Sequence, residues 1–181
     1  MVTNPTPLNV VVVCGNPKVN SRTLGVAVEV AQQAAAAAGR GGDVSTHVID
    51  LGTLASSVFD WSSEAVKAEV ATLSRADLAV VASPTFKASY TGLLKSFLDW
   101  FGPTELAGVV AIPVMVGGSV IHALAPEVFL RPLLVEVGAI VPTRGLFILD
   151  VELDQLPTTV AAWADGAAGA LRRLLGPRLP G

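Results

Sequence analysis

The amino-acid sequence predicts an α/β fold, a doubly wound sheet of five parallel strands with helices on both faces. Segments typical of strands alternate with segments typical of helices five times along the 181 residues. Such alternation requires crossover connections, which make the strands parallel. Hydrophobic residues make up 51% of the chain and charged residues only 15%, so a chain of this length can bury a sizeable core. We expect residues 1–181 to form a single domain.

The elements of the first half follow from short apolar runs and helix caps. Residues 8–14 are typical of a buried strand because the run is short and rich in Val. Ser21 can cap a helix that extends to about Ala38, and glycines at 39, 41 and 42 end it. We also expect strands at 44–51 and 76–82, with a helix between them that opens at Ser62 or Ser63.

The second half continues the alternation. After a loop at residues 83–91, a short helix carries apolar residues along one side, and residues 109–116 form the fourth strand. An apolar helix at 123–137, a strand region at 140–149 and an Ala-rich helix at about 156–175 complete the chain. Pro132 should distort the first of these helices locally, because it lacks a backbone donor. Five such strands fit the flavodoxin-like order 2-1-3-4-5, in which ligands bind at the carboxyl ends of the first and third strands.

Composition and charge exclude several classes of protein. Twelve Lys and Arg against fifteen Asp and Glu give a net charge of −3, without the basic clusters that nucleic acid requires. Residues 106–126 carry no charge over a length that could cross a membrane, but Pro113 and the pair Gly117-Gly118 interrupt them, so we expect no membrane segment. The single cysteine, Cys14, cannot form an internal disulfide, and no export signal is visible. We expect a cytoplasmic protein.

The loop after the first strand has the chemistry of a phosphate site. A helix N-terminus offers free N–H groups and partial positive charge, and Ser21, Arg22 and Thr23 add two hydroxyls and a guanidinium. An ordinary helix cap with a solvated arginine is the alternative interpretation. The loop matches neither a P-loop nor a dinucleotide fingerprint, so a mononucleotide phosphate fits better.

Two further loops follow the third and fourth strands, at the same edge of the predicted sheet. Residues 83–92 combine small residues with Phe86 and Tyr90, which can line a flat ring system or simply pack. Gly117-Gly118-Ser119 can bring backbone N–H groups close to a ligand, or can form a plain turn between strand and helix.

Taken together, the three loops resemble those of the NAD(P)H-dependent FMN reductases, most closely the branch that supplies reduced flavin to alkanesulfonate monooxygenases. The resemblance runs in register from about residue 8 to residue 139. It rests on residues 15–23, on 83–95, and on 117–119 followed by His122 and Leu130-Arg131-Pro132. It implies a flavodoxin-like flavin reductase that uses FMN and NADPH or NADH, with a possible flavin-dependent monooxygenase partner, assembled as a homodimer or homotetramer.

Carried over by position, the resemblance also implies a set of cofactor-binding residues. Ser21, Arg22 and Thr23 would hold the FMN phosphate, the loop after the third strand would shape the ribityl and ring site, and Gly117-Gly118 would lie near the ring edge. The full set is Asn16, Ser21, Arg22, Thr23, Pro84, Thr85, Phe86, Lys87, Ser89, Tyr90, Gly117, Gly118 and Ser119.

The sequence departs from the family pattern at two places. Asn16 stands where the family more often has Ser, which affects one hydrogen bond to the phosphate or ribityl chain. Val128, with Phe129 beside it, stands where sulfonate-linked relatives can carry an aromatic residue, on the helix that is said to mediate assembly in those relatives. We expect this apolar helix to form part of an oligomer interface.

Hydride transfer between nicotinamide and flavin belongs to the cofactors, so no catalytic side chain is expected. Neither His47 nor His122 has partners at the spacing of metal ligands, and we expect no metal site. Cys14, inside a strand, should be inert core. Three alternatives remain open: a quinone or azo-compound reductase with bound FMN, a flavodoxin-type electron carrier, and a flavin-free interaction module of the same fold. No basic pair is clearly placed for a 2′-phosphate, so the sequence favours neither NADH nor NADPH.

Overall fold

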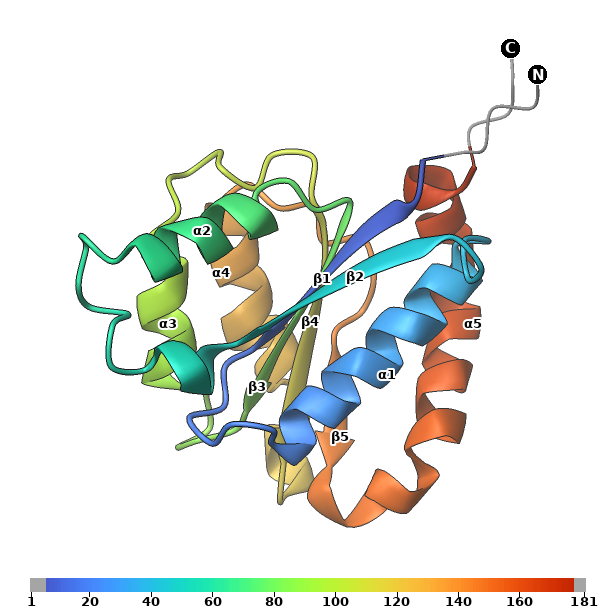
Figure 1. Ribbon diagram of the computed structural model, residues 1–181. Coiled ribbons are helices and arrows are strands. Elements are labelled where there is room, and N and C mark those ends of the chain that lie inside the picture. Colours follow the sequence, from blue (N-terminus) through green and yellow to red (C-terminus); the bar gives the residue numbers. More distant parts are fainter. Residues whose placement is uncertain (1–5, 178–181) are drawn as a thin grey trace.

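The centre of the molecule is one sheet of five parallel strands, seen in a computed structural model that describes residues 6–177 (Figure 1). The strands are β1 (Leu8–Cys14), β2 (Val44–Asp50), β3 (Leu78–Pro84), β4 (Val110–Gly117) and β5 (Leu146–Leu149). Their order across the sheet is β2-β1-β3-β4-β5, and every neighbouring pair is parallel. The predicted doubly wound order is therefore confirmed.

Helices cover both faces of this sheet (Figure 1). On one face lie α1 (Arg22–Ala37) and α5 (Leu156–Leu175), and on the other lie α2 (Glu64–Leu73), α3 (Gly92–Leu98) and α4 (Arg131–Glu136). The alternation of β1 divides the core, because Val10 and Val12 pack toward α1 and α5, whereas Val11 and Val13 pack toward the other three helices. A strand covered on both faces has no polar side, which explains the continuous run of Val.

Two predicted strands end elsewhere than expected. The third strand begins at Leu78, directly after Asp77, whose side chain accepts a hydrogen bond from the backbone N–H of Asn9 in β1 (2.8 Å), and it runs on through Pro84. The fifth strand is only Leu146–Leu149, so the expectation of strand from residue 140 is wrong. Ile140 forms one isolated bridge to β4, and the chain then leaves the sheet.

The predicted apolar helix at residues 123–137 is not one continuous α-helix. It consists of a π-helical segment, Pro126–Leu130, followed by α4, with a 3₁₀ turn (Val120–His122) before it. Pro132 lacks the N–H that would bond the carbonyl of Val128, and the N–H of Arg131 reaches back to Pro126 instead. The predicted distortion at Pro132 is confirmed, and the continuous helix is corrected.

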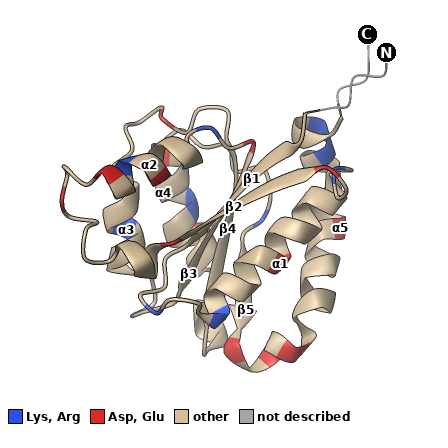
Figure 2. Cartoon of the chain, in the orientation of Figure 1, with Lys and Arg blue, Asp and Glu red and all other residues tan. Residues whose placement is uncertain are grey.

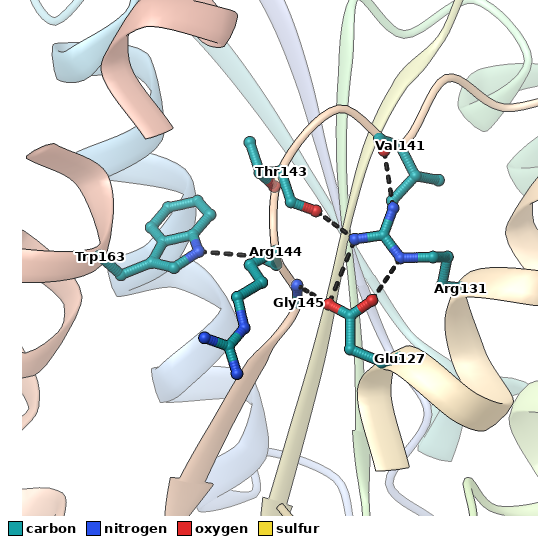
Figure 3. A network of polar contacts seen from close by, with 7 residues as sticks. All are labelled: Glu127, Arg131, Val141, Thr143, Arg144, Gly145 and Trp163. Carbon is teal, nitrogen blue, oxygen red and sulfur yellow. Dashed lines mark hydrogen bonds and ion pairs between the residues drawn. The ribbon is translucent and has the colours of Figure 1, made fainter. Parts of the chain in front are cut away.

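A polar network fastens the π-helical segment to the connection that precedes β5 (Figure 3). The carboxylate of Glu127 accepts hydrogen bonds from Nε of Arg131 and from the backbone N–H of Gly145, each at 2.5 Å. The guanidinium of Arg131 also donates to the carbonyls of Val141 (2.7 Å) and Thr143. These bonds occupy carbonyls that a longer strand would have used in the sheet, which is why β5 is short.

Trp163 of α5 holds the same connection from the opposite face of the sheet. Its indole N–H donates to the carbonyl of Arg144 at 2.8 Å (Figure 3). Irregular backbone between β4 and β5 is thus tied to helices on both sides, and the carbonyls of Val141, Thr143 and Arg144 find side-chain donors without strand pairing.

The long uncharged stretch at residues 106–126 contributes the buried strand β4 and the turns on either side of it. Among the helices within residues 6–177, none is long and apolar enough to cross a membrane.

Ion pairing within this network depends on pH. The Arg131 guanidinium lowers the pKa of Glu127, with help from the Gly145 N–H and against a smaller opposing effect of burial. Because the pKa is lower in the folded than in the unfolded chain, the pair stabilises the fold at pH values above the unfolded pKa. This stabilisation is lost as the pH falls through the folded pKa.

Replacing Glu127 by Gln should therefore lower the free energy of unfolding at pH 7 by about 1 kcal/mol, after allowance for solvent screening. The variant should also lose less stability than the wild type between pH 7 and pH values below the carboxyl pKa. Urea denaturation at several pH values measures both effects. Glu136→Gln, at an exposed position of α4, is the control and should change little; equal pH dependence in the wild type and the Glu127 variant would contradict this account.

Candidate functional site

A cleft of about 230 Å³ lies at the carboxyl ends of β1, β3 and β4, where the predicted strand order places a ligand. Its walls come from the loop after β1, the start of α1, the turn after β3, the end of β4 and the residue that follows β5. The lining residues are Asn16, Lys18, Ser21, Arg22, Thr23, Pro84, Thr85, Phe86, Val116, Gly117, Gly118 and Asp150.

One end of the cleft is the N-terminus of α1. Ser21 caps the helix, and its hydroxyl accepts a hydrogen bond from the N–H of Leu24 (3.3 Å). The N–H groups of Arg22 and Thr23 belong to the first turn, where no intrahelical acceptor exists. Free N–H groups at the positive end of a helix dipole attract an anion. This end of the cleft therefore has the chemistry of a phosphate site.

Asn16 shapes the loop that leads into this helix. Its side-chain oxygen accepts a hydrogen bond from the N–H of Lys18 (2.9 Å), and its Nδ2 donates to Oγ1 of Thr23 (3.1 Å). Asn20 then turns the chain with a positive φ of 53°, a conformation that asparagine tolerates better than most residues. The Asn that departs from the family's more frequent Ser thus connects the loop to the helix start and directs the Thr23 hydroxyl.

The turn after β3 is tight and strained. The N–H of Phe86 donates to the carbonyl of Ser89 (2.9 Å), and the N–H of Ser89 donates back to Phe86 (3.2 Å). Between them, Lys87 and Ala88 have positive φ values of 51° and 68°, although neither is Gly. Two such residues in succession favour a mirror-image hairpin turn, which non-glycine residues adopt only at a cost. The turn presents Phe86 at the cleft with its side chain 54% exposed.

Buried hydroxyls join this turn to the loop after β1. Oγ1 of Thr91 donates to the carbonyl of Gly15 (2.6 Å) and accepts from the N–H of Leu94 (3.1 Å), which caps α3. The N–H of Thr91 donates in turn to Oγ of Ser83 (3.0 Å). A side chain at position 15 would meet Cβ of Leu94 at 2.6 Å, so only Gly fits there.

The third wall is the Gly117-Gly118 pair at the end of β4. A Cβ on Gly117 would approach the ring of Phe147 at 2.8 Å and Oγ1 of Thr85 at 3.0 Å, whereas a Cβ on Gly118 would meet open space. Gly117 has no room for a side chain. At Gly118 the absence of a side chain leaves the backbone open, so a ligand can approach the main chain there. Oγ1 of Thr85 is buried at this wall and has no hydrogen-bond partner within residues 6–177. An unpartnered buried hydroxyl in a cleft fits a polar ligand.

Charge in the cleft is mixed. Lys18 and Arg22 are positive, and Asp150 faces Arg22 with Nη2 and Oδ1 3.6 Å apart. Figure 2 shows the basic start of α1 beside the acidic segment that follows β5. Cys14 lies beneath, with its sulfur 3.5 Å from the Ser21 hydroxyl, and burial raises the pKa of its thiol. Cys14 is fully buried, as expected for a residue of the core.

The cleft collects most of the predicted site residues: Asn16, Ser21, Arg22, Thr23, Pro84, Thr85, Phe86, Gly117 and Gly118. Four others do not line it. Lys87 lies at the exposed tip of its turn, Ser89 closes that turn, Tyr90 packs against the core, and Ser119 precedes the 3₁₀ turn without capping it.

Three residues that line the cleft were not predicted as site residues from the sequence, namely Lys18, Val116 and Asp150. Lys18 lies within the first motif, where its position between Asn16 and Ser21 was a usable signal. Nothing in the sequence connects Asp150 to that motif. No group of three or more His, Cys, Asp and Glu side chains within the described part of the chain could hold a metal, and His47 pairs with Glu69 instead (2.7 Å).

An anion-binding helix start, a turn carrying an aromatic ring and a glycine pair, gathered at the switch point of a 2-1-3-4-5 sheet, define a flavodoxin-like protein with a mononucleotide site. The family of NADPH-dependent FMN reductases matches residues 8–154. An NADH-dependent FMN reductase of Pseudomonas putida, SfnE, is 32% identical over 164 residues, 88% of this chain and 86% of that protein. The chain therefore belongs to the NADPH-dependent FMN reductase family.

Solved structures agree. The apo form of an NADH:FMN oxidoreductase, EMOB, matches with a TM-score of 0.77 at 31% identity, over 94% of this chain and 91% of that one. A flavodoxin from the domain Archaea matches with a TM-score of 0.60 at 16% identity, over 91% of this chain and 99% of that one, which supports the fold alone. The predicted fold, the reductase class, and FMN with a reduced nicotinamide nucleotide as its ligands are confirmed.

Proposed function

We propose that this protein passes a hydride from reduced nicotinamide directly to FMN held in the cleft, and releases reduced FMN to a flavin-dependent monooxygenase. One observation supports the proposal above all: the start of α1, which can bind a phosphate, and the exposed ring of Phe86 line the same cleft. When bound, FMN supplies the ring that accepts the hydride, so the protein needs no acid or base of its own. Its residues bind, orient and space the two nucleotides.

Each wall has a task in this scheme. The first-turn N–H groups of α1, with Ser21, Arg22 and Thr23, hold the phosphate. Thr85 offers its unpartnered hydroxyl to the ribityl chain or the ring, and Phe86 and Gly118 border the ring. Lys87, Ser89 and Tyr90 act by shaping the turn that carries Phe86, and Ser119 follows the glycine pair.

NADPH and NADH both serve as candidate hydride donors. The family's description specifies NADPH, whereas SfnE is described as NADH-dependent. A cell compartment that keeps these nucleotides reduced also keeps Cys14 as a thiol, and we infer a cytoplasmic location.

Direct hydride transfer predicts a primary isotope effect. In anaerobic single-turnover reduction of FMN by 4-deuterated NADH or NADPH, the deuterated donor should react more slowly. Lys95→Ala, on the exposed side of α3 where Lys95 pairs with Asp99, should leave the effect unchanged. Parallel assays with FAD, riboflavin and a quinone define the acceptor. If neither nucleotide reduces FMN anaerobically, the reductase proposal fails and an electron-carrier role replaces it.

The phosphate assignment is tested at Arg22. Arg22→Ala should weaken FMN binding about tenfold or more and riboflavin binding much less, because only FMN carries the phosphate and a charge-assisted hydrogen bond contributes roughly 1.5–3 kcal/mol. Quenching of flavin fluorescence measures both dissociation constants. Equal weakening of the two flavins would place the phosphate elsewhere.

The apolar surface around the π-helical segment supports a homo-oligomer, a dimer or a tetramer. Leu130 and Leu134 face the core, while the neighbouring side chains point outward. The exposed members of this apolar patch are Val120 (67%), Ile121 (80%), Leu124 (62%), Val128 (56%), Phe129 (41%), Val135 (54%) and Ile140 (42%). So many exposed apolar side chains in one segment of the chain favour an interaction site, and a second copy of the chain is the partner we propose.

Val128→Glu should therefore dissociate the assembly, because it places a charge among these exposed apolar side chains. Light scattering after size exclusion gives the mass directly. Val48→Glu is the matched control, since Val48 is 41% exposed on the edge strand β2, away from the patch. A wild-type mass near 18.6 kDa at micromolar concentration would rule out the oligomer.

A further inference from the structure

An acidic side chain lies at the phosphate end of the cleft, where an anion is to bind. Asp150 begins the 3₁₀ segment Asp150–Gln155 that follows β5, and it lines the cleft together with Arg22. In the sheet Gly117 pairs with Leu149, and the residues that directly follow this pair, Gly118 and Asp150, both line the cleft. The register between β4 and β5 therefore brings Asp150 to the cleft.

We propose that Asp150 competes with the phosphate of FMN for Arg22, and that it thereby weakens FMN binding so that the flavin exchanges as a substrate. The inference rests on the proposed phosphate site. It assigns Asp150 as a residue that determines affinity and the preference between FMN and flavins without a phosphate.

The geometry of the Arg22–Asp150 pair indicates that Asp150 competes with the phosphate for Arg22 and does not orient Arg22 for it. A carboxylate that orients an arginine for a ligand makes short, charge-assisted hydrogen bonds of about 2.7–2.9 Å. The closest approach here is 3.6 Å, and the side chains of Arg22 and Asp150 are 69% and 38% exposed. Asp150 therefore attracts Arg22 electrostatically, without a short hydrogen bond that would hold the guanidinium in place. To bind the Arg22 guanidinium, a phosphate at the start of α1 must displace it from Asp150.

The surrounding charges act in the same direction. Glu152 and Asp154 follow in the same 3₁₀ segment, and Figure 2 shows this acidic stretch close to the basic start of α1. A phosphate that enters the cleft meets the positive charges of Lys18 and Arg22 together with the negative charge of Asp150. Oxidised and reduced FMN carry the same phosphate, so Asp150 affects both alike and favours turnover of the bound flavin.

The test compares the binding of oxidised FMN and riboflavin to the wild type and to Asp150→Asn, by fluorescence quenching at low ionic strength without nicotinamide. Asparagine keeps the size and removes the charge. FMN should bind about two- to fivefold more tightly, as expected for loss of one exposed ion pair, and riboflavin should bind unchanged. The gain should vanish in about 1 M salt. Asp154→Asn, the same substitution at an exposed position outside the cleft, should give a clearly smaller gain.

A second comparison separates this inference from the phosphate site itself. In an Arg22→Ala background, Asp150→Asn should bring little further gain, because there is no guanidinium to contest. Unchanged or weaker FMN binding in Asp150→Asn would overturn the competition, as would a gain of equal size in the Arg22→Ala background. If Arg22→Ala alone affects FMN and riboflavin equally, the phosphate site has failed, whatever Asp150 does.

Discussion

The relative position of two cleft walls depends on one buried hydroxyl, that of Thr91. It donates to the carbonyl of Gly15 after β1 and accepts from Leu94 at the start of α3, while the adjacent N–H binds Ser83 at the end of β3. All of these groups are removed from water, so nothing can replace a lost partner, and a buried carbonyl left unpaired costs about 1–3 kcal/mol. Parallel strands bring the two loops to one edge of the sheet, and Thr91 fixes the distance between them.

Local signals in the sequence predicted the elements whose cause is local. The Val run of β1, the Ser21 cap of α1 and the uninterrupted helix of α5 lie where they were expected, because burial on both faces and capping act over a few residues. The short β5 was not predictable in this way. It is accompanied by the network of Glu127 and Arg131, whose partners lie up to 18 residues away and are brought together only by the fold.

The candidate site also contains residues that local sequence signals predict and residues that they do not. Asn16 and residues 21–23, 84–86 and 117–118 were predicted and line the cleft, because each loop directly follows a strand and the sheet order brings the loops together. Lys87, Ser89 and Tyr90 were assigned as parts of a motif, yet none of them lines the cleft, and Tyr90 packs against the core. Asp150 could not be found, because its place beside Gly118 depends on the register between β4 and β5, which no local pattern encodes.

The strained turn at Lys87 and Ala88 also bears on how the flavin is protected. Its ends are held by two reciprocal backbone hydrogen bonds, and its two central residues are strained because they lie in the left-handed region without being Gly. In this conformation Phe86 stands at the cleft and is 54% exposed to solvent, so the turn borders the cleft without covering it. In the proposed scheme, shielding the reduced product from dioxygen falls to whatever binds next, whether a second nucleotide, a neighbouring subunit or a receiving enzyme, and the rate of that step determines how much reduced flavin is lost to oxygen.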